Sequence, residues 1–135
     1  NAFRRLRKNL TEPLFNSWGY NTRSAALRIP CSDENNRRIE YRLAGADANP
    51  YLVVATILTG MLYGLENFDE DDLPEPQQDE PVLPLFQQQA IEVFSRNQYL
   101  TDSLGEAFSQ QWVACKLSEL DWFESIVTEQ ESALT

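Results

Sequence analysis

The chain has 135 residues, of which 11 are lysine or arginine and 21 are aspartate or glutamate, so its formal net charge is −10. This length fits one domain or part of one, and a hydrophobic content of 42% can fill a core, which argues against global disorder. The sequence contains no histidine, which excludes serine–histidine and cysteine–histidine catalytic sites, and its two cysteines are too few for a disulfide scaffold.

The first residue is asparagine rather than methionine, so we expect the chain to be cut from a longer polypeptide. No apolar run has the length of a membrane span or the position of a signal peptide. We therefore expect a reduced, cytoplasmic protein that does not associate with membranes.

The charge is distributed unevenly along the chain. Residues 1–42 carry nine basic and four acidic side chains, a net charge of +5, whereas residues 43–135 carry two basic and 17 acidic ones, a net charge of −15. Eight of the nine basic residues are arginine, whose planar guanidinium binds carboxylates and phosphates through two points. We expect a small anionic ligand rather than a nucleic acid, which the acidic remainder would repel.

Alternating residues near the N-terminus predict a β-hairpin, preceded over residues 1–22 by a loop with at most one short strand. Residues 24–29 alternate before Pro30, residues 37–43 alternate again, and the polar residues 31–36 form the connecting turn. Alternate side chains of a strand share a face. In the second strand, one face carries Arg38, Glu40 and Arg42, and the other, expected in a core, carries Ile39, Tyr41 and Leu43.

The rest of the chain is predicted to be mainly helical. Asn49 and Pro50 suit the start of a helix, and residues 51–65 are so uniformly apolar that we expect this helix to be buried. Gly60 and Gly64 lie four residues apart, a spacing that lets another backbone approach closely. The helical pattern fails at Asn67.

An acidic, proline-containing segment over residues 67–84 is predicted to be a solvated loop. A short helix is predicted over residues 86–95, and a longer one from about Ser103, because Ser103 and Glu106 fit a capping box. An apolar stripe along the longer helix is expected to contact the core or a partner helix. The stripe consists of Phe108, Trp112, Cys115, Leu120, Phe123 and Val127.

Four blocks, in order, resemble the glutamine synthetase family. They are Asn1-Ala2-Phe3-Arg4-Arg5-Leu6, Asn21-Thr22-Arg23-Ser24-Ala25-Ala26-Leu27-Arg28-Ile29-Pro30, Arg37-Arg38-Ile39-Glu40-Tyr41-Arg42 and Ala48-Asn49-Pro50-Tyr51-Leu52. The segments Trp18-Gly19 and Gly45-Ala46-Asp47-Ala48-Asn49 resemble the branch of this family that joins glutamate to polyamines more than the ammonia-using branch.

The resemblance implies an α+β fold in which residues 1–135 form a single partial domain, the C-terminal portion of the catalytic domain. Residues 1–48 would supply strands and active-site residues, and residues 49–135 would be mainly helical. It implies an ATP-dependent ligase that phosphorylates glutamate and transfers the γ-glutamyl group to an amine, either a polyamine such as putrescine or ammonia. Family members work as large homo-oligomers, and this segment alone is expected to be inactive.

The resemblance also implies roles for individual residues. Glu40 matches a carboxylate that binds Mg²⁺ or Mn²⁺, and Arg5 and Arg42 match arginines that bind glutamate. Arg23, Arg28 and Arg38 match arginines around the ATP phosphates, with Arg23 and Arg28 also acting on the transferred phosphoryl group. Arg28 is five positions after Arg23, so a regular strand would place them on opposite faces unless it bends or starts after Arg23.

One departure from the family pattern concerns the flap that carries a glutamate in ammonia-using members. Counting without a gap places Thr11 at that position and Glu12 one residue later, so either alignment stays open. On spacing alone, the row of Arg38, Glu40 and Arg42 also fits an ordinary solvated strand face. The alternative function is a non-catalytic, glutamine synthetase-like or helical module that binds a protein partner.

Overall fold

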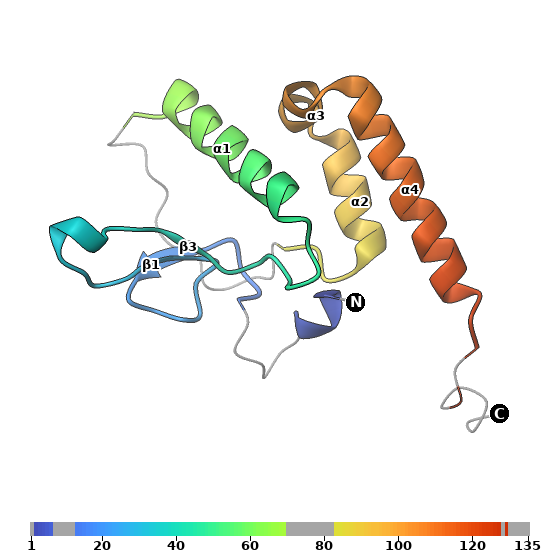
Figure 1. Ribbon diagram of the computed structural model, residues 1–135, viewed down its shortest axis with the longest axis horizontal. Helices are drawn as coiled ribbons and strands as arrows, with labels where there is room; N and C mark the ends of the chain where they lie inside the picture. The colour runs from blue at the N-terminus through green and yellow to red at the C-terminus, as the bar shows by residue number, and fades with distance from the viewer. Residues whose placement is uncertain (1, 7–12, 70–82, 128, 130–135) are drawn as a thin grey trace. The chain divides into compact units, whose positions relative to one another are not determined.

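The computed structural model describes residues 2–6, 13–69, 83–127 and 129. They divide into two compact units, residues 1–85 and residues 86–135. The first unit contains the strands and the long apolar helix, and the second is helical (Figure 1). The fold is therefore mixed α+β, and the strands among the described residues lie in the N-terminal third of the chain.

Three short strands form one sheet among the described residues of the first unit, in the order β1 (Trp18–Tyr20), β2 (Leu27–Ile29), β3 (Glu40–Tyr41). β2 and β3 are antiparallel, which confirms the predicted hairpin with shorter strands, and Arg28 lies directly opposite Glu40. The 3₁₀-helix η2 (Glu34–Asn36) occupies the connection between them. A second 3₁₀-helix, η1 (Ala2–Arg5), lies in the segment predicted to be a loop.

β1 pairs in parallel with β2, an arrangement that requires a sharp return of the chain between them. A Cβ atom added at Gly19 would lie 2.8 Å from Cγ2 of Thr22, so glycine is needed for this close approach. The return segment is also the packed part of the unit, since Ala25 and Ala26 are buried there beside Ser17. The Ser17 hydroxyl accepts a hydrogen bond from the backbone N–H of Ala26 at 3.4 Å.

The prediction that Ile39 and Tyr41 face a core is wrong. Ile39 is 60% exposed and Tyr41 is 41% exposed, while Leu43 is half-buried. β3 is an edge strand of two residues, and its main contacts with other elements in the described part of the chain are with β2. The partial burial that Tyr41 does have raises the pKa of its phenol above 10.0.

Helix α1 (Pro50–Asn67) begins and ends where the sequence predicts. The Asn49 side chain accepts hydrogen bonds from the backbone N–H groups of Tyr51 and Leu52, and proline occupies the first turn. The prediction of burial is wrong, because no residue of α1 is buried within the described part of the chain. An apolar helix needs a covering surface, and the described residues do not supply one; Gly60 and Gly64 likewise have no neighbouring atom within 4 Å of an added Cβ.

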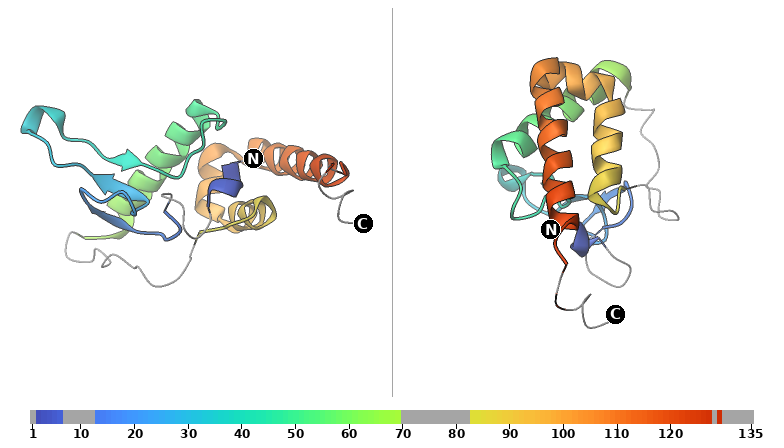
Figure 2. Two further views of the ribbon diagram at one scale, coloured as in Figure 1. Left: turned by 90° about the horizontal axis from the view of Figure 1, so that it is seen from below. Right: turned by 90° about the vertical axis from the view of Figure 1, so that its right-hand side faces the viewer.

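The second unit packs three helices together, α2 (Gln87–Arg96), α3 (Gln98–Leu104) and α4 (Glu106–Glu124). α2 confirms the predicted short helix, and it lies beside α4 (Figure 2, right). The Gln87 side chain donates a hydrogen bond to the Lys116 carbonyl at 3.4 Å across this contact. Ile91 of α2 is buried, and so is Ser109 of α4.

The predicted capping box at Ser103 and Glu106 is wrong. Ser103 lies inside α3, where its hydroxyl donates to the Tyr99 carbonyl at 2.7 Å, and α4 begins after Gly105 without a side-chain cap. The chain turns at Gly105, whose φ of 92° lies in the region that favours glycine. The prediction therefore missed α3 and started the long helix within it.

The predicted apolar stripe of the long helix is only partly confirmed. Trp112 and Leu120 are half-buried, whereas the other four members are exposed: Phe108, Cys115, Phe123 and Val127. The face of α4 that is covered runs one residue further along, through Ser109, Val113 and Lys116.

Residues 70–82 of the predicted acidic loop lie outside the described part of the chain. Among the residues that the structure does describe, no helix has the length and apolar character needed to cross a membrane.

Candidate active site

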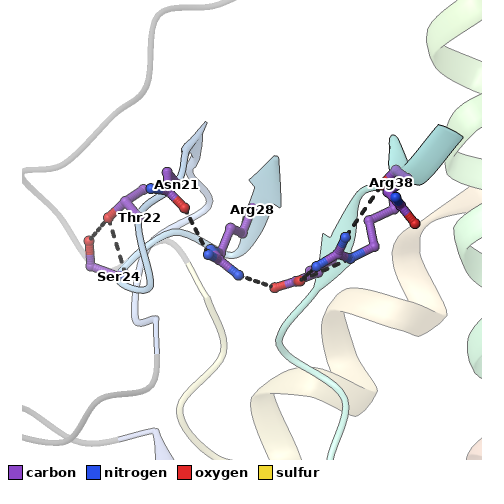
Figure 3. Close-up of polar contacts among 7 residues, drawn as sticks. Asn21, Thr22, Ser24, Arg28 and Arg38 are labelled. Carbon is purple, nitrogen blue, oxygen red and sulfur yellow. Dashed lines mark hydrogen bonds and ion pairs between the residues drawn. The ribbon is translucent and has the colours of Figure 1, made fainter. Parts of the chain in front are cut away.

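Two arginines, Arg28 and Arg38, each donate to a different oxygen of the Glu40 carboxylate (both arginines are labelled in Figure 3). Arg28 on β2 lies opposite Glu40 on β3, and its Nη1 donates to Oε2 at 2.8 Å. Arg38, two residues before Glu40, donates to Oε1 from Nη2 at 3.2 Å and from Nε at 3.3 Å. The cluster is partly shielded from water, since the side chain of Arg28 is 17% exposed and that of Glu40 is 32% exposed.

These contacts keep Glu40 ionised. Hydrogen bonding from Arg28 is the main cause that lowers the pKa of the Glu40 carboxyl below its usual 4.5, and Arg38 adds to it, while partial desolvation opposes both. A deprotonated carboxylate has about four lone-pair sites, so two arginines do not exhaust it. The carboxylate is therefore available as a hard oxygen ligand at neutral pH.

Asn21 is a member of this cluster that the residue-by-residue assignment missed. Its Oδ1 accepts a hydrogen bond from Nη2 of Arg28 at 2.9 Å (Figure 3). Asn21 follows β1 directly and has a φ of 53°, a left-handed conformation that asparagine tolerates better than most residues. Asn21 is the first residue of the second block that resembles the family, and it lies at a turn next to a strand. That position is the sequence signal that could have identified it as a site residue.

Arg5 lies close to Arg42 because its side chain contacts the backbone of the next residue, Leu43. Nη2 of Arg5 donates to the carbonyl of Leu43 at 2.9 Å, and the backbone N–H of Arg42 donates to the carbonyl of Ala26 at 3.0 Å. The structure thus brings η1 to the end of β3, where Arg42 lies.

Two guanidinium nitrogens in this region are buried without a hydrogen-bond partner among the described residues, Nη1 of Arg42 and Nε of Arg28. An unpaired buried donor on a charged group is costly, by at least about 1–3 kcal/mol. A hydrogen-bond acceptor brought to each nitrogen would remove that cost. Carboxylate and phosphate groups are acceptors of this kind, so the two nitrogens are compatible with the small anionic ligand that the sequence predicts.

Arg23 is exposed, and its side chain makes no hydrogen bond or ion pair with any residue that the structure describes. β2 begins at Leu27, so the strand starts after Arg23, which is one of the arrangements that the five-residue spacing allowed. The structure therefore brings Arg28, Arg38 and Glu40 together but does not bring Arg23 into contact with them.

A complete metal centre is not formed by the described residues, which contain no group of three or more histidine, cysteine, aspartate or glutamate side chains able to hold an ion. Glu40 fits the role of a single ligand to Mg²⁺ or Mn²⁺, because such ions commonly combine one or two carboxylates with phosphate oxygens. Thr11 and Glu12, the two candidates for the flap position, lie outside the described residues.

A pocket next to β1 contains none of the predicted site residues. It is lined by Phe15, Ser17, Trp18, Thr22, Ser24 and Ala25. Trp18, which belongs to the segment that resembles the polyamine branch, thus borders a pocket with both aromatic and hydroxyl groups.

Comparison with known proteins identifies relatives along nearly the whole chain. Residues 1–134 match the family described as glutamine synthetase, catalytic domain. The gamma-glutamylputrescine synthetase PuuA of Escherichia coli is 45% identical over 97% of this chain and 29% of its own length. Human lengsin is 37% identical over 95% of this chain and 26% of its own, and the glutamine synthetase of Pyrococcus abyssi is 30% identical over 80% and 27%. The chain thus spans under a third of the length of these relatives.

Proposed function

The chain belongs to the glutamine synthetase family, and on that premise we propose that it is the C-terminal part of the catalytic domain of an ATP-dependent glutamate–amine ligase. In this proposal residues 1–48 contribute the active-site strands and residues 49–135 the helical remainder. The full-length protein would work as a large homo-oligomer in the cytoplasm.

The observation that carries the proposal is the Glu40 carboxylate, which Arg28 and Arg38 contact at 2.8 Å and 3.2 Å and keep ionised. Two buried guanidinium nitrogens of the same unit, Nη1 of Arg42 and Nε of Arg28, have no hydrogen-bond partner among the described residues. A solvated strand face would not need to desolvate these donors. Two arginines pair with one carboxylate, so the cluster keeps a net positive charge, which a site for anionic groups and a divalent cation would explain.

We assign the residues as follows. Arg5 and Arg42 bind the carboxylates of glutamate, and Arg38 binds the ATP phosphates. Arg23 and Arg28 bind the phosphates and stabilise the negative charge of the phosphoryl group during its transfer. Glu40 supplies one ligand to Mg²⁺ or Mn²⁺, which neutralises phosphate charge when bound.

The proposed reaction has two steps. First, an oxygen of the glutamate side-chain carboxylate attacks the terminal phosphorus of ATP, which gives γ-glutamyl phosphate and ADP. The amine nitrogen then attacks the γ-carbonyl carbon, phosphate leaves with the bonding electrons, and the nitrogen gives up one proton. The arginines act by positioning and by charge neutralisation in both steps.

We propose a polyamine such as putrescine as the amine, with ammonia as the alternative. The relative from Escherichia coli is named for γ-glutamylputrescine synthesis and shares 45% identity. There is also a chemical reason: an ammonium-selective pocket needs a carboxylate to hold NH₄⁺ and take its proton, and the ungapped flap position is Thr11. A polyamine has a second cationic group that can bind elsewhere.

The test is steady-state kinetics of the full-length protein with ATP and glutamate, comparing putrescine, spermidine and ammonium. We expect ATP- and glutamate-dependent release of phosphate, with a higher kcat/KM for putrescine or spermidine than for ammonium. A kcat/KM for ammonium above that of every polyamine would show that the protein makes glutamine rather than a γ-glutamyl polyamine. Absence of phosphate release with any amine would overturn the ligase proposal itself.

A further inference from the structure

The guanidinium of Arg28 is held at both of its terminal nitrogens by residues from two different segments. Nη1 donates to Glu40 at 2.8 Å and Nη2 donates to Asn21 at 2.9 Å. Asn21 follows β1, Arg28 lies on β2 and Glu40 lies on β3, so one network crosses the whole sheet (Figure 3). Rotation of the guanidinium would break one contact or the other.

The backbone at Asn21 favours asparagine or glycine but does not require asparagine. Its φ of 53° is the only positive value at a non-glycine residue in the described part of the chain. Glycine would adopt this conformation at lower cost. The backbone hydrogen bond from Asn21 to the Ile29 carbonyl, at 2.9 Å, would also survive that replacement. What glycine would lose is the Oδ1 acceptor for Arg28.

We infer that Asn21 is a positioning residue that holds the guanidinium of Arg28 in the orientation needed for phosphoryl transfer. The inference rests on the proposed function, in which Arg28 contacts the transferred phosphoryl group. Asn21 and Glu40 fix the two terminal nitrogens of the guanidinium. Its remaining N–H groups therefore keep one direction, and no conformational entropy has to be lost to order them during the reaction. Positioning of this kind affects the transition state more than the binding of glutamate.

The test compares four forms of the full-length protein. Asn21→Gly keeps the left-handed backbone and removes the acceptor, while Asn21→Asp keeps an acceptor oxygen. Ser24→Ala is the matched control in the same loop, because it removes the exposed hydrogen bond between Ser24 and Thr22 (2.9 Å) and makes no contact with Arg28.

The first measurement does not depend on activity. Arginine side chains are modified with phenylglyoxal and the rate at Arg28 is followed by peptide mass spectrometry, with exposed Arg23 as the internal reference. We expect Arg28 to react at least about threefold faster in Asn21→Gly than in the wild type, with wild-type rates in Asn21→Asp and Ser24→Ala. An unchanged rate at Arg28 in Asn21→Gly would overturn the inference, and a rate raised at every arginine would show unfolding rather than release of one side chain, which would also count against it.

The second measurement is the kinetics of the proposed ligase reaction. We expect Asn21→Gly to lower kcat about tenfold with KM for glutamate changed by less than twofold, and Asn21→Asp to recover most of kcat. A wild-type kcat in Asn21→Gly would overturn the positioning role even if Arg28 reacts faster. If the wild type itself has no ligase activity, the proposed function fails, and the modification rates still decide whether Asn21 holds Arg28.

Discussion

At the scale of single residues, the contacts of Glu40 define the candidate site. The alternation of residues 37–43 predicted that Arg38 and Glu40 share a face, and their ion pair at 3.2 Å confirms that they do. The alternation could not predict that Arg28 faces Glu40, because register depends on the length and geometry of the connection, here a 3₁₀-helix. Nor could it predict the contact of Asn21, which depends on the parallel pairing of β1 and β2.

We predict that Arg42→Ala in the full-length protein raises KM for glutamate more than it lowers kcat. An arginine that binds a substrate carboxylate contributes similarly to the ground and transition states, so its loss mainly weakens binding. A hydrogen bond to a charged group contributes about 1.5–3 kcal/mol, which corresponds to a rise of roughly 10- to 150-fold in KM. Arg37→Ala is the control, because Arg37 is exposed and pairs only loosely with Glu34, at 3.9 Å. A KM for glutamate equal to the wild-type value in Arg42→Ala would refute the assignment.

The ionisation of Glu40 predicts a pH dependence of stability. Its pKa is lower in the folded state than its usual 4.5, so the stabilisation is complete above pH 4.5 and is lost as the pH falls through the folded-state pKa. We expect Glu40→Gln to lower the unfolding temperature at pH 7, and this difference from the wild type to shrink as the pH falls below 4.5. Thermal unfolding of both proteins between pH 7 and pH 3 measures it, and a difference that stays constant over this range would contradict the prediction.

At the scale of the elements, the sequence signals that act on the local backbone predicted several helix and turn boundaries correctly. The Asn49 cap with Pro50, the polar turn after Pro30 and the end of the helix at Asn67 all appear where the sequence placed them. The error at Ser103 has a physical cause, since the capping pattern was satisfied in the sequence but Gly105 supplies the break between α3 and α4 instead.

The return of the chain between β1 and β2 gives a test of the fold. Gly19→Ala places a methyl group 2.8 Å from Cγ2 of Thr22, and we expect it to destabilise the protein by about 1–3 kcal/mol. Thr22→Ser removes that Cγ2 atom and keeps the hydroxyl, so the double variant should recover most of the loss. Urea denaturation of the single and double variants measures the coupling.

Gly60→Ala is the control for this pair, since an added Cβ there meets no atom within 4 Å. Alanine in a helix interior should stabilise the protein by about 0.5–1 kcal/mol relative to glycine. Equal destabilisation by Gly19→Ala with and without Thr22→Ser would show that the close approach is not the cause.

At the scale of the whole molecule, the sequence predicted the fold class and the family but not which surfaces are covered. The uniform apolar character of α1 predicted burial, yet Tyr51 is 84% exposed and Leu65 is 82% exposed in the described part of the chain. Composition shows that an apolar helix needs another apolar surface packed against it. It does not show where in the polypeptide the residues of that surface lie. A segment that spans 29% of a relative's length does not have to contain them.

Glu40 is proposed as a metal ligand in a glutamate–amine ligase, and the dependence of activity on magnesium in full-length Glu40→Ala is the sharpest experiment on that role. We predict that kcat at limiting Mg²⁺ falls by at least about 10- to 100-fold, the loss typical of removing even an outer partner of a bound metal. Glu34→Ala, which removes an exposed carboxylate from the connection between β2 and β3, should keep the wild-type kcat. A near-normal kcat for Glu40→Ala at limiting Mg²⁺ would show that Glu40 does not bind the metal.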